Sequence, residues 1–157
     1  MKGEIISSLQ NPIIKSVIQL QKKKSARKKE KLFIVEGIKC VNEIPSSYKV
    51  KYYILTPYFT REQIPALESK KCIVVTEEVY KSLSETTTPQ GVMAVVEMPN
   101  VAIDSLKAEK DTFYLVLENI QDPGNLGTII RSAHAFGVHA VLVTKGSVDL
   151  YSPKVVR

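Results

Sequence analysis

A strand, a polar loop, a helix and a second strand follow one another between Phe113 and Val143. The run from Phe113 to Leu117 is continuously apolar, which is typical of a strand buried on both faces. Val138 to Val143 is predicted to form the second strand. Between them, apolar side chains recur at helical spacing before a glycine suited to end a helix: Leu126, Ile129, Ile130, Ala133, Phe136 and then Gly137. Two parallel strands joined by a helix form a right-handed βαβ unit, so an α/β fold is predicted.

The loop from Glu118 to Gly127 is polar and rich in turn-forming residues. It offers Asp122 and Asn125 as candidate helix caps, and its glycines allow close approach of a phosphate or nucleotide. The loop lacks the glycine spacing of dinucleotide-binding folds and the lysine of a P-loop, so neither motif supports nucleotide binding. At 100° per residue, Arg131 falls about 140° around the helix from Leu126, so it faces solvent or a ligand.

The first part of the chain also alternates strands with helices. Strands are predicted at residues 32–35, 52–55, 72–75 and 91–97, and helices at 38–44, 61–67 and 76–83. The alternation stops at Met98-Pro99-Asn100, and residues 100–111 have no sustained apolar period. We therefore predict a first domain over residues 1–98, a linker over 99–111 and a second domain over 112–157.

Positive charge is concentrated in residues 1–31, which carry nine Lys or Arg against Glu4 and Glu30, whereas the remaining residues are nearly neutral. Asn11-Pro12 begins a single predicted helix over residues 11–29. Its basic half is predicted to contact RNA phosphates through Lys22, Lys23, Lys24, Arg27, Lys28 and Lys29. A solvated helix that only keeps the protein soluble is the alternative. A membrane surface is disfavoured, because no Trp, Phe or Leu stands opposite the charges.

The composition excludes several classes of protein. With 44% hydrophobic and 24% charged residues, the chain can form a core and is not disordered. Cys40 and Cys72 lie far apart without a neighbouring histidine, so no disulfide framework or metal site is predicted. A reducing, cytoplasmic compartment is expected. The longest apolar runs have five residues, so no membrane-spanning segment is expected.

The segment from Leu117 to Val143 resembles the first signature motif of the SpoU (TrmH-type) family, which are RNA 2′-O-ribose methyltransferases of the SPOUT superfamily. The motif residues are Asn125, Arg131 and Phe136-Gly137, and the resemblance continues through Tyr151 to Arg157. Three shorter segments resemble the substrate-binding domain of such enzymes: residues 8–15, 33–37 and 88–91. The resemblance implies a ribosomal-protein-like RNA-binding α/β domain, followed by the first βαβ part of a knotted, Rossmann-like SPOUT domain.

Catalytic roles for Arg131 and Asn125 are implied by this resemblance, with Arg131 acting on the ribose 2′-hydroxyl and Asn125 helping to place it. Because a guanidinium hardly ever loses its proton, we expect Arg131 to orient the hydroxyl, hold a phosphate and stabilise the alkoxide rather than act as a base. The resemblance also implies S-adenosyl-L-methionine as cofactor, a homodimer, and structured RNA as substrate. Ribosomal RNA is favoured over tRNA, because simpler tRNA-modifying relatives lack the extra N-terminal domain.

Ser152-Pro153 is predicted to begin a helix only a few residues before Arg157. The family's second and third motifs, which build the cofactor pocket and much of the dimer interface, are not found in the sequence. We therefore expect a fragment of a longer enzyme that binds the cofactor weakly or not at all and is inactive alone, and no cofactor-binding residue is assigned. The alternatives are a non-catalytic RNA-binding protein and a small nucleotide-binding α/β domain. An antibiotic-resistance methyltransferase is not separable by sequence from a housekeeping one.

Overall fold

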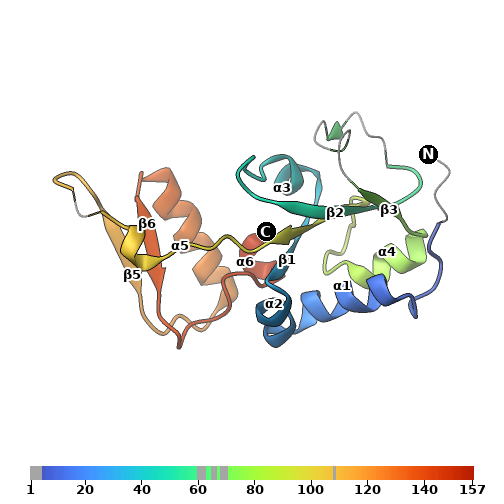
Figure 1. Ribbon diagram of the computed structural model, residues 1–157, viewed down its shortest axis with the longest axis horizontal. Coiled ribbons are helices and arrows are strands. Elements are labelled where there is room, and N and C mark those ends of the chain that lie inside the picture. The colour runs from blue at the N-terminus through green and yellow to red at the C-terminus, as the bar shows by residue number, and fades with distance from the viewer. Residues whose placement is uncertain (1–4, 60–62, 65–66, 68–70, 108) are drawn as a thin grey trace. The chain divides into compact units, whose positions relative to one another are not determined.

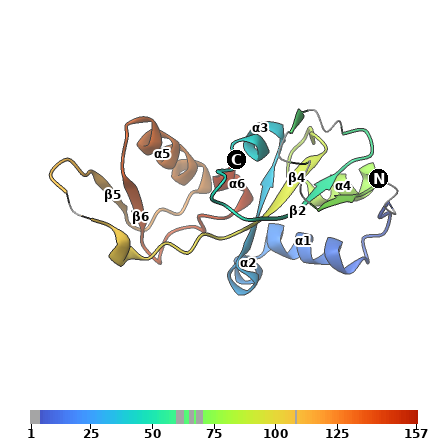
Figure 2. The same ribbon diagram turned by 45° about the horizontal axis from the view of Figure 1, so that its top comes forward.

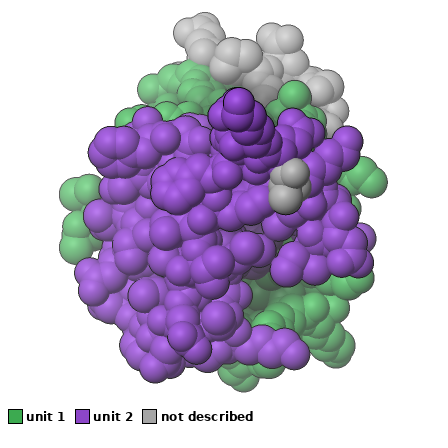
Figure 3. All heavy atoms as spheres, turned by 90° about the vertical axis from the view of Figure 1, so that its left-hand side faces the viewer, with its two compact units in different colours: residues 1–98, 157 green, residues 99–156 purple. Residues whose placement is uncertain are grey.

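The computed structural model describes residues 5–59, 63–64, 67, 71–107 and 109–157. The chain divides into two compact units, coloured separately in Figure 3. Unit 1 comprises residues 1–98 together with Arg157, and unit 2 comprises residues 99–156. Each unit has its own sheet and its own hydrophobic core, so each is described by itself.

Unit 1 is built on a four-stranded mixed sheet (Figure 1). Its strands are β1 (Leu32–Glu36), β2 (Val50–Leu55), β3 (Cys72–Val74) and β4 (Val92–Glu97), in the spatial order β1-β4-β2-β3. Strand β4 is antiparallel to both of its neighbours, whereas β2 and β3 are parallel. All four strands lie where the sequence pattern predicted them.

Helices cover both faces of this sheet. α1 (Pro12–Lys22) and α4 (Glu77–Leu83) lie on one face, and α3 (Ile38–Asn42) lies on the other (Figures 1 and 2). Successive strand residues point to opposite faces, so a strand covered on both sides is apolar throughout. This explains why residues 92–96 of β4 are all buried. The core beneath α1 and α4 includes Ile14, Val17, Leu20, Ile34, Ile54, Val79, Tyr80, Met93 and Val95.

The prediction of one helix over residues 11–29 is wrong. The structure has two helices, α1 and α2 (Lys24–Glu30), separated by Lys23 in an extended conformation with φ −121° and ψ 118°. The break is stabilised by Arg27, whose Nη1 donates to the carbonyl oxygens of Leu20 at 2.6 Å and Gln21 at 2.9 Å. These are carbonyls of the last turn of α1, which have no partner within the helix. Folding back at Lys23 allows a side chain of α2 to satisfy them.

The predicted helix starts agree with the structure. Pro12 is the first residue of α1, and the Asn11 side chain accepts a hydrogen bond from the Ile13 amide at 2.9 Å. Thr76 caps α4 through Oγ1, which accepts from the Val79 amide at 3.4 Å. The predicted helix over residues 61–67 lies mostly outside the described residues.

Unit 2 contains the predicted βαβ arrangement. Strands β5 (Tyr114–Leu117) and β6 (Ala140–Val143) are parallel, and α5 (Pro123–Ala135) connects them and packs on one face of the pair (Figures 1 and 2). The last helix, α6 (Pro153–Val156), contributes Val155 to the same core. This core comprises Leu115, Leu117, Ile120, Leu126, Ile129, Ile130, Val141, Val143, Val148 and Val155.

Burial of these two strands differs from the expectation that both faces would be covered. α5 covers one face of the pair, whereas Val116, which points to the opposite face, is 63% exposed. A short 3-10 helix, η3 (Ile103–Ser105), precedes β5. Within the described part of the chain, no helix combines the length and apolar character needed to cross a bilayer.

Candidate functional site

The N-terminus of α5 is capped by Asp122 rather than by Asn125. Asp122 Oδ1 accepts a hydrogen bond from the Asn125 backbone amide at 2.7 Å, and Pro123 follows as the first helical residue. A side-chain oxygen that accepts from the third helical amide is the usual N-cap interaction. The exposed amide side chain of Asn125 therefore has no capping role in this helix.

Arg131 lies on the exposed side of α5, as predicted, and its side chain bends back toward the helix N-terminus. Its Nη2 donates to Oγ1 of Thr128 at 3.3 Å. Gly127 makes room for this conformation, because a Cβ at that position would lie 3.1 Å from Arg131 Nη1. Thr128 lies three residues from both Asn125 and Arg131, so it stands between them on the helix surface. Asn125 and Arg131 are about 120° apart around the helix, and Thr128 lies between them on its exposed side.

A cavity of about 470 Å³ opens beside this helix start. It is lined by Asn119, Ile120, Gln121, Asp122, Asn125, Thr128 and Ile129. Five of these seven residues are polar. Arg131 is not itself a lining residue, but its guanidinium bonds Thr128, which is one. Amide, hydroxyl and guanidinium groups together offer donors and acceptors suited to sugar hydroxyls and phosphate oxygens.

The loop after β5 lines this cavity together with α5, and Gln121 joins that loop to the loop after β6. Gln121 Nε2 donates to Asn119 Oδ1 at 2.7 Å and to the Gly146 carbonyl at 2.8 Å. Asn119 adopts a left-handed backbone conformation, with φ 53°, and its backbone N–H donates to Thr144 Oγ1 at 3.2 Å. The loops follow β5 and β6, so the cavity lies at the carboxyl end of the parallel strands, where α/β folds place ligands.

Sequence reasoning missed Gln121, Asn119 and Thr128 as parts of this site. The available signal was topological, because the loops after two neighbouring parallel strands must meet at one edge. The histidines have no place among the lining residues of the cavity: His134 is exposed, and His139 Nδ1 accepts from the Phe113 amide at 3.2 Å. Glu118 is exposed after β5 and also does not line the cavity.

Five of the six predicted RNA-binding residues are exposed on unit 1: Lys22, Lys23, Lys24, Lys28 and Lys29. Arg27 is the exception, because it is only 4% exposed and its guanidinium bonds the end of α1. Burial therefore removes Arg27 from the surface on which the sequence analysis placed it.

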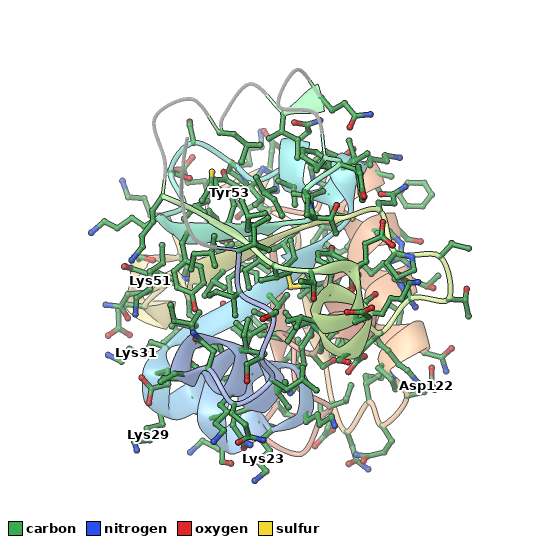
Figure 4. All side chains as sticks on the ribbon, turned by 90° about the vertical axis from the view of Figure 1, so that its right-hand side faces the viewer. Lys23, Lys29, Lys31, Lys51, Tyr53 and Asp122 are labelled. Carbon is green, nitrogen blue, oxygen red and sulfur yellow. The ribbon has the colours of Figure 1, made fainter. Side chains whose placement is uncertain are left out.

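Two further lysines continue the exposed series. Figure 4 shows Lys23, Lys29, Lys31 and Lys51 projecting along one side of unit 1, and we call these four residues the basic edge. Lys51 belongs to β2, far from the helices in sequence. The strand register brings Lys51 to the same end of the sheet as Lys31. The end of β4 lies between the starts of β1 and β2, with Glu97 opposite Leu32 and Val96 opposite Val50. Glu30 and Glu97 are exposed acidic groups in this region.

The chain therefore has two α/β units, with exposed lysines on the first and a cavity beside a helix N-terminus on the second. This combination is typical of proteins that bind and modify RNA. Residues 11–94 match the MRM3-like substrate binding domain, and residues 112–157 match the SpoU rRNA Methylase family. The chain belongs to the SpoU rRNA methylase family and carries an MRM3-like substrate-binding domain. These matches confirm the resemblance inferred from the sequence, and the solved structures described below confirm the fold class.

Individual relatives agree with this family. The chain is 33% identical over 152 residues to the 23S rRNA (guanosine(2553)-2′-O)-methyltransferase RlmP of Bacillus subtilis, covering 97% of this chain and 59% of that protein. It is 32% identical over 151 residues to the human mitochondrial rRNA methyltransferase 3, covering 92% of this chain and 36% of the relative. The chain thus spans little more than half of the first relative and about a third of the second.

Solved structures show the same fold. An AdoMet-bound rRNA methyltransferase from Sinorhizobium meliloti superposes with a TM-score of 0.85 at 29% identity, covering 98% of this chain and 59% of that chain. The SpoU methyltransferase AviRb from Streptomyces viridochromogenes, in complex with AdoMet, gives 0.80 at 25% identity, covering 94% of this chain and 56% of that chain.

Among the residues that the structure describes, no site for S-adenosylmethionine is recognised beside α5. The cavity beside α5 has no aromatic lining residue, and its polar groups suit a sugar and a phosphate better than an adenine ring. We therefore assign none of the described residues to the cofactor.

Proposed function

We propose that the protein containing this chain methylates the 2′-oxygen of a ribose in structured RNA, with ribosomal RNA favoured over tRNA. The observation that carries this proposal is a cavity at the carboxyl end of two parallel strands that is lined by Asn125 and Thr128, with the Arg131 guanidinium hydrogen-bonded to Thr128. The family to which the chain belongs and the rRNA methyltransferases it resembles support the same reaction.

Arg131 acts on the RNA as a permanent cation. Its guanidinium stays protonated, so it cannot remove the hydroxyl proton, but it can hold a neighbouring phosphate through two parallel N–H groups. The same charge stabilises the oxygen as it loses its proton. The exposed amide of Asn125 can donate to and accept from ribose hydroxyls, which fixes the sugar in the cavity.

S-adenosylmethionine supplies the electrophilic methyl group when it is bound by the whole protein, and we propose that this protein acts as a cytoplasmic homodimer. Residues 1–98 form the RNA-binding domain in this proposal, and residues 112–157 belong to the catalytic domain. Lysines of the basic edge and of α1 and α2 neutralise phosphates, so RNA binding weakens as salt concentration rises.

Methyl transfer by the longer protein that includes this chain tests the proposal. We expect wild-type protein to transfer labelled methyl groups to ribosomal RNA, and Arg131→Ala to abolish transfer while RNA affinity stays within about twofold, because most affinity comes from the first domain. Arg131→Lys should also be severely impaired, because an ammonium group cannot form the paired contact. Lys110→Ala, at an exposed position outside both sites, is the matched control.

Failure of the wild-type protein to methylate either ribosomal RNA or tRNA, with salt-dependent RNA binding intact, would contradict the proposal. That result would instead favour a non-catalytic RNA-binding protein. Loss of RNA binding in Arg131→Ala together with loss of transfer would show that Arg131 acts only in binding.

A further inference from the structure

Unit 1 carries a second cavity, of about 390 Å³, which the RNA-phosphate contacts of the basic edge do not explain. Among its lining residues are Thr56, which follows β2, and Gly91, which precedes β4. At this end of the sheet Leu55 pairs with Val92, whereas the basic edge begins at the end where Leu32 pairs with Glu97. The cavity and the basic edge are therefore at opposite ends of the strands. Strands of this length span about 17 to 20 Å.

An exposed aromatic ring stands in this cavity wall. Tyr58 is 81% exposed, and the neighbouring Phe59 is partly buried in the same wall. Tyr58 is the third residue after the end of β2. A tyrosine so exposed contributes little to the core, but its face is available for stacking.

Polar side chains also line the cavity, and a hydrogen bond orients one of them. Gln90 Oε1 accepts a hydrogen bond from the Ile38 amide at 2.8 Å, which settles which end of the side-chain amide is oxygen. Its Nε2 remains a donor, and no hydrogen bond from it is found among the described residues. Glu77 and Lys81 also line the cavity and stand four residues apart on α4, so their charges offset each other.

The floor of the cavity depends on a glycine. Gly91 has φ 76°, and a Cβ at this position would lie 2.5 Å from Thr56 Oγ1. The strand start can therefore approach Thr56 closely, and the Thr56 amide donates to the Gly91 carbonyl at 2.9 Å. These contacts join the end of β2 to the start of β4 at this part of the cavity.

We propose that this cavity binds an unpaired nucleobase of the RNA, stacked on Tyr58 and contacted at its edge by the Gln90 amide. The inference rests on the proposed RNA-binding function of unit 1. An aromatic face with a hydrogen-bonding group beside it is the chemistry by which proteins hold bases of single-stranded loops and bulges. The near-neutral charge of the cavity complements a base, whereas the basic edge complements phosphates.

Binding of two fluorescent RNA hairpins to the full chain tests this inference. The hairpins share one stem and one loop backbone, but in one of them the loop nucleotides are abasic. We expect wild-type protein to prefer the intact loop, and Tyr58→Ala to lower the affinity for that RNA about 5- to 150-fold while leaving the abasic hairpin unchanged. Tyr58→Phe should keep the preference, because it keeps the stacking face.

Two matched variants separate this role from general effects. Phe113→Ala removes another exposed aromatic, 57% exposed on unit 2, and should leave both affinities unchanged. The chain has no tryptophan, so Tyr58→Trp introduces a single indole at the cavity. We expect its fluorescence to be quenched by the intact hairpin and not by the abasic one.

Equal affinity of wild-type protein for the two hairpins would overturn the inference that the cavity binds a base. If that affinity still fell with rising salt, the proposed RNA-binding function would stand. Absence of salt-dependent binding to any hairpin would overturn both. A loss in Tyr58→Ala that is the same for both hairpins would also contradict the inference, because it would not depend on a base.

Discussion

Neighbouring basic residues in one segment have different tasks, and burial separates them. Lys28 and Lys29 are exposed, whereas Arg27 turns inward and bonds two carbonyls at the end of α1. A planar guanidinium with several donors can satisfy two acceptors at once, which an ammonium at the same place does less well. Charge counting alone therefore overestimates by one residue the surface available to RNA.

Replacing Arg27 tests this division. We expect Arg27→Ala to lower the free energy of unfolding by about 2 to 4 kcal/mol, because two buried carbonyls lose a charged donor. The salt dependence of RNA binding by the folded variant should not change. Urea denaturation measures the first effect and binding titrations at several salt concentrations measure the second.

Lys28→Ala is the matched control, since it removes a neighbouring positive charge from the surface. Its stability should stay within about 0.5 kcal/mol of wild type, and its salt slope should fall by about 1. Reversed results for the two variants would show that Arg27, not Lys28, faces the RNA.

Two left-handed glycines allow a second comparison at the residue scale. Gly91 and Gly137 have similar φ values of 76° and 71°, but a Cβ at Gly91 would lie 2.5 Å from Thr56 Oγ1, while one at Gly137 meets nothing within 4 Å. Gly137→Ala should cost about 1 to 2 kcal/mol, from the left-handed conformation alone. Gly91→Ala should cost more, because a steric clash is added. Thermal or urea unfolding measures how much stability each variant loses. Equal losses for Gly91→Ala and Gly137→Ala would contradict this prediction.

Elements with strong local patterns were predictable from the sequence, and contacts between distant segments were not. The βαβ arrangement followed from two apolar runs around an amphipathic helix, and the motif positions of Asn125 and Arg131 followed from family resemblance. The break at Lys23 depends on a hydrogen bond from Arg27 that helical periodicity does not encode. Lys51 and Gln121 reach their places through strand pairing and loop contacts, which no local pattern specifies.

The start of α5 yields a prediction at the element scale. Asp122→Ala should destabilise unit 2 by about 1 kcal/mol, because the Asn125 amide loses its capping acceptor. Asn125→Ala should leave the stability nearly unchanged, since its side chain does not cap the helix, but should reduce methyl transfer by the longer protein. Hydrogen exchange of α5 amides measures the first effect and transfer assays measure the second. Equal destabilisation by both changes would show that Asn125 supports the helix.

At the scale of the whole molecule, the proposed RNA contacts and the proposed ribose chemistry belong to different units. The basic edge and the second cavity belong to unit 1, whereas Asn125, Arg131 and the first cavity belong to unit 2. Each unit also has its own core. Substitutions in unit 1 are therefore expected to change RNA affinity, and substitutions in unit 2 to change methyl transfer. Measuring both quantities for each variant separates the two effects.

Buried tyrosines make the stability of unit 1 sensitive to alkaline pH. Burial raises the pKa of Tyr80 above its ordinary value of 10.0, the Glu36 carboxylate raises it further, and the Val92 backbone N–H offsets part of the change. Burial also raises the pKa values of Tyr52 and Tyr53. Because the phenols stay neutral in the folded chain but ionise in the unfolded chain near pH 10, stability is retained below pH 10 and falls as the pH rises above it.

Tyr80→Phe should remove one such contribution. For each ionising phenol, stability falls by about 1.4 kcal/mol per pH unit above the unfolded pKa, so the variant should lose stability less steeply than wild type on that limb. Urea unfolding of both proteins on either side of pH 10 gives the two slopes. Tyr58→Phe, which removes an exposed phenol, should leave the wild-type slope unchanged. Parallel curves for Tyr80→Phe and wild type would show that the Tyr80 phenol ionises alike in the folded and unfolded chain, and the alkaline loss would then have to arise from other groups.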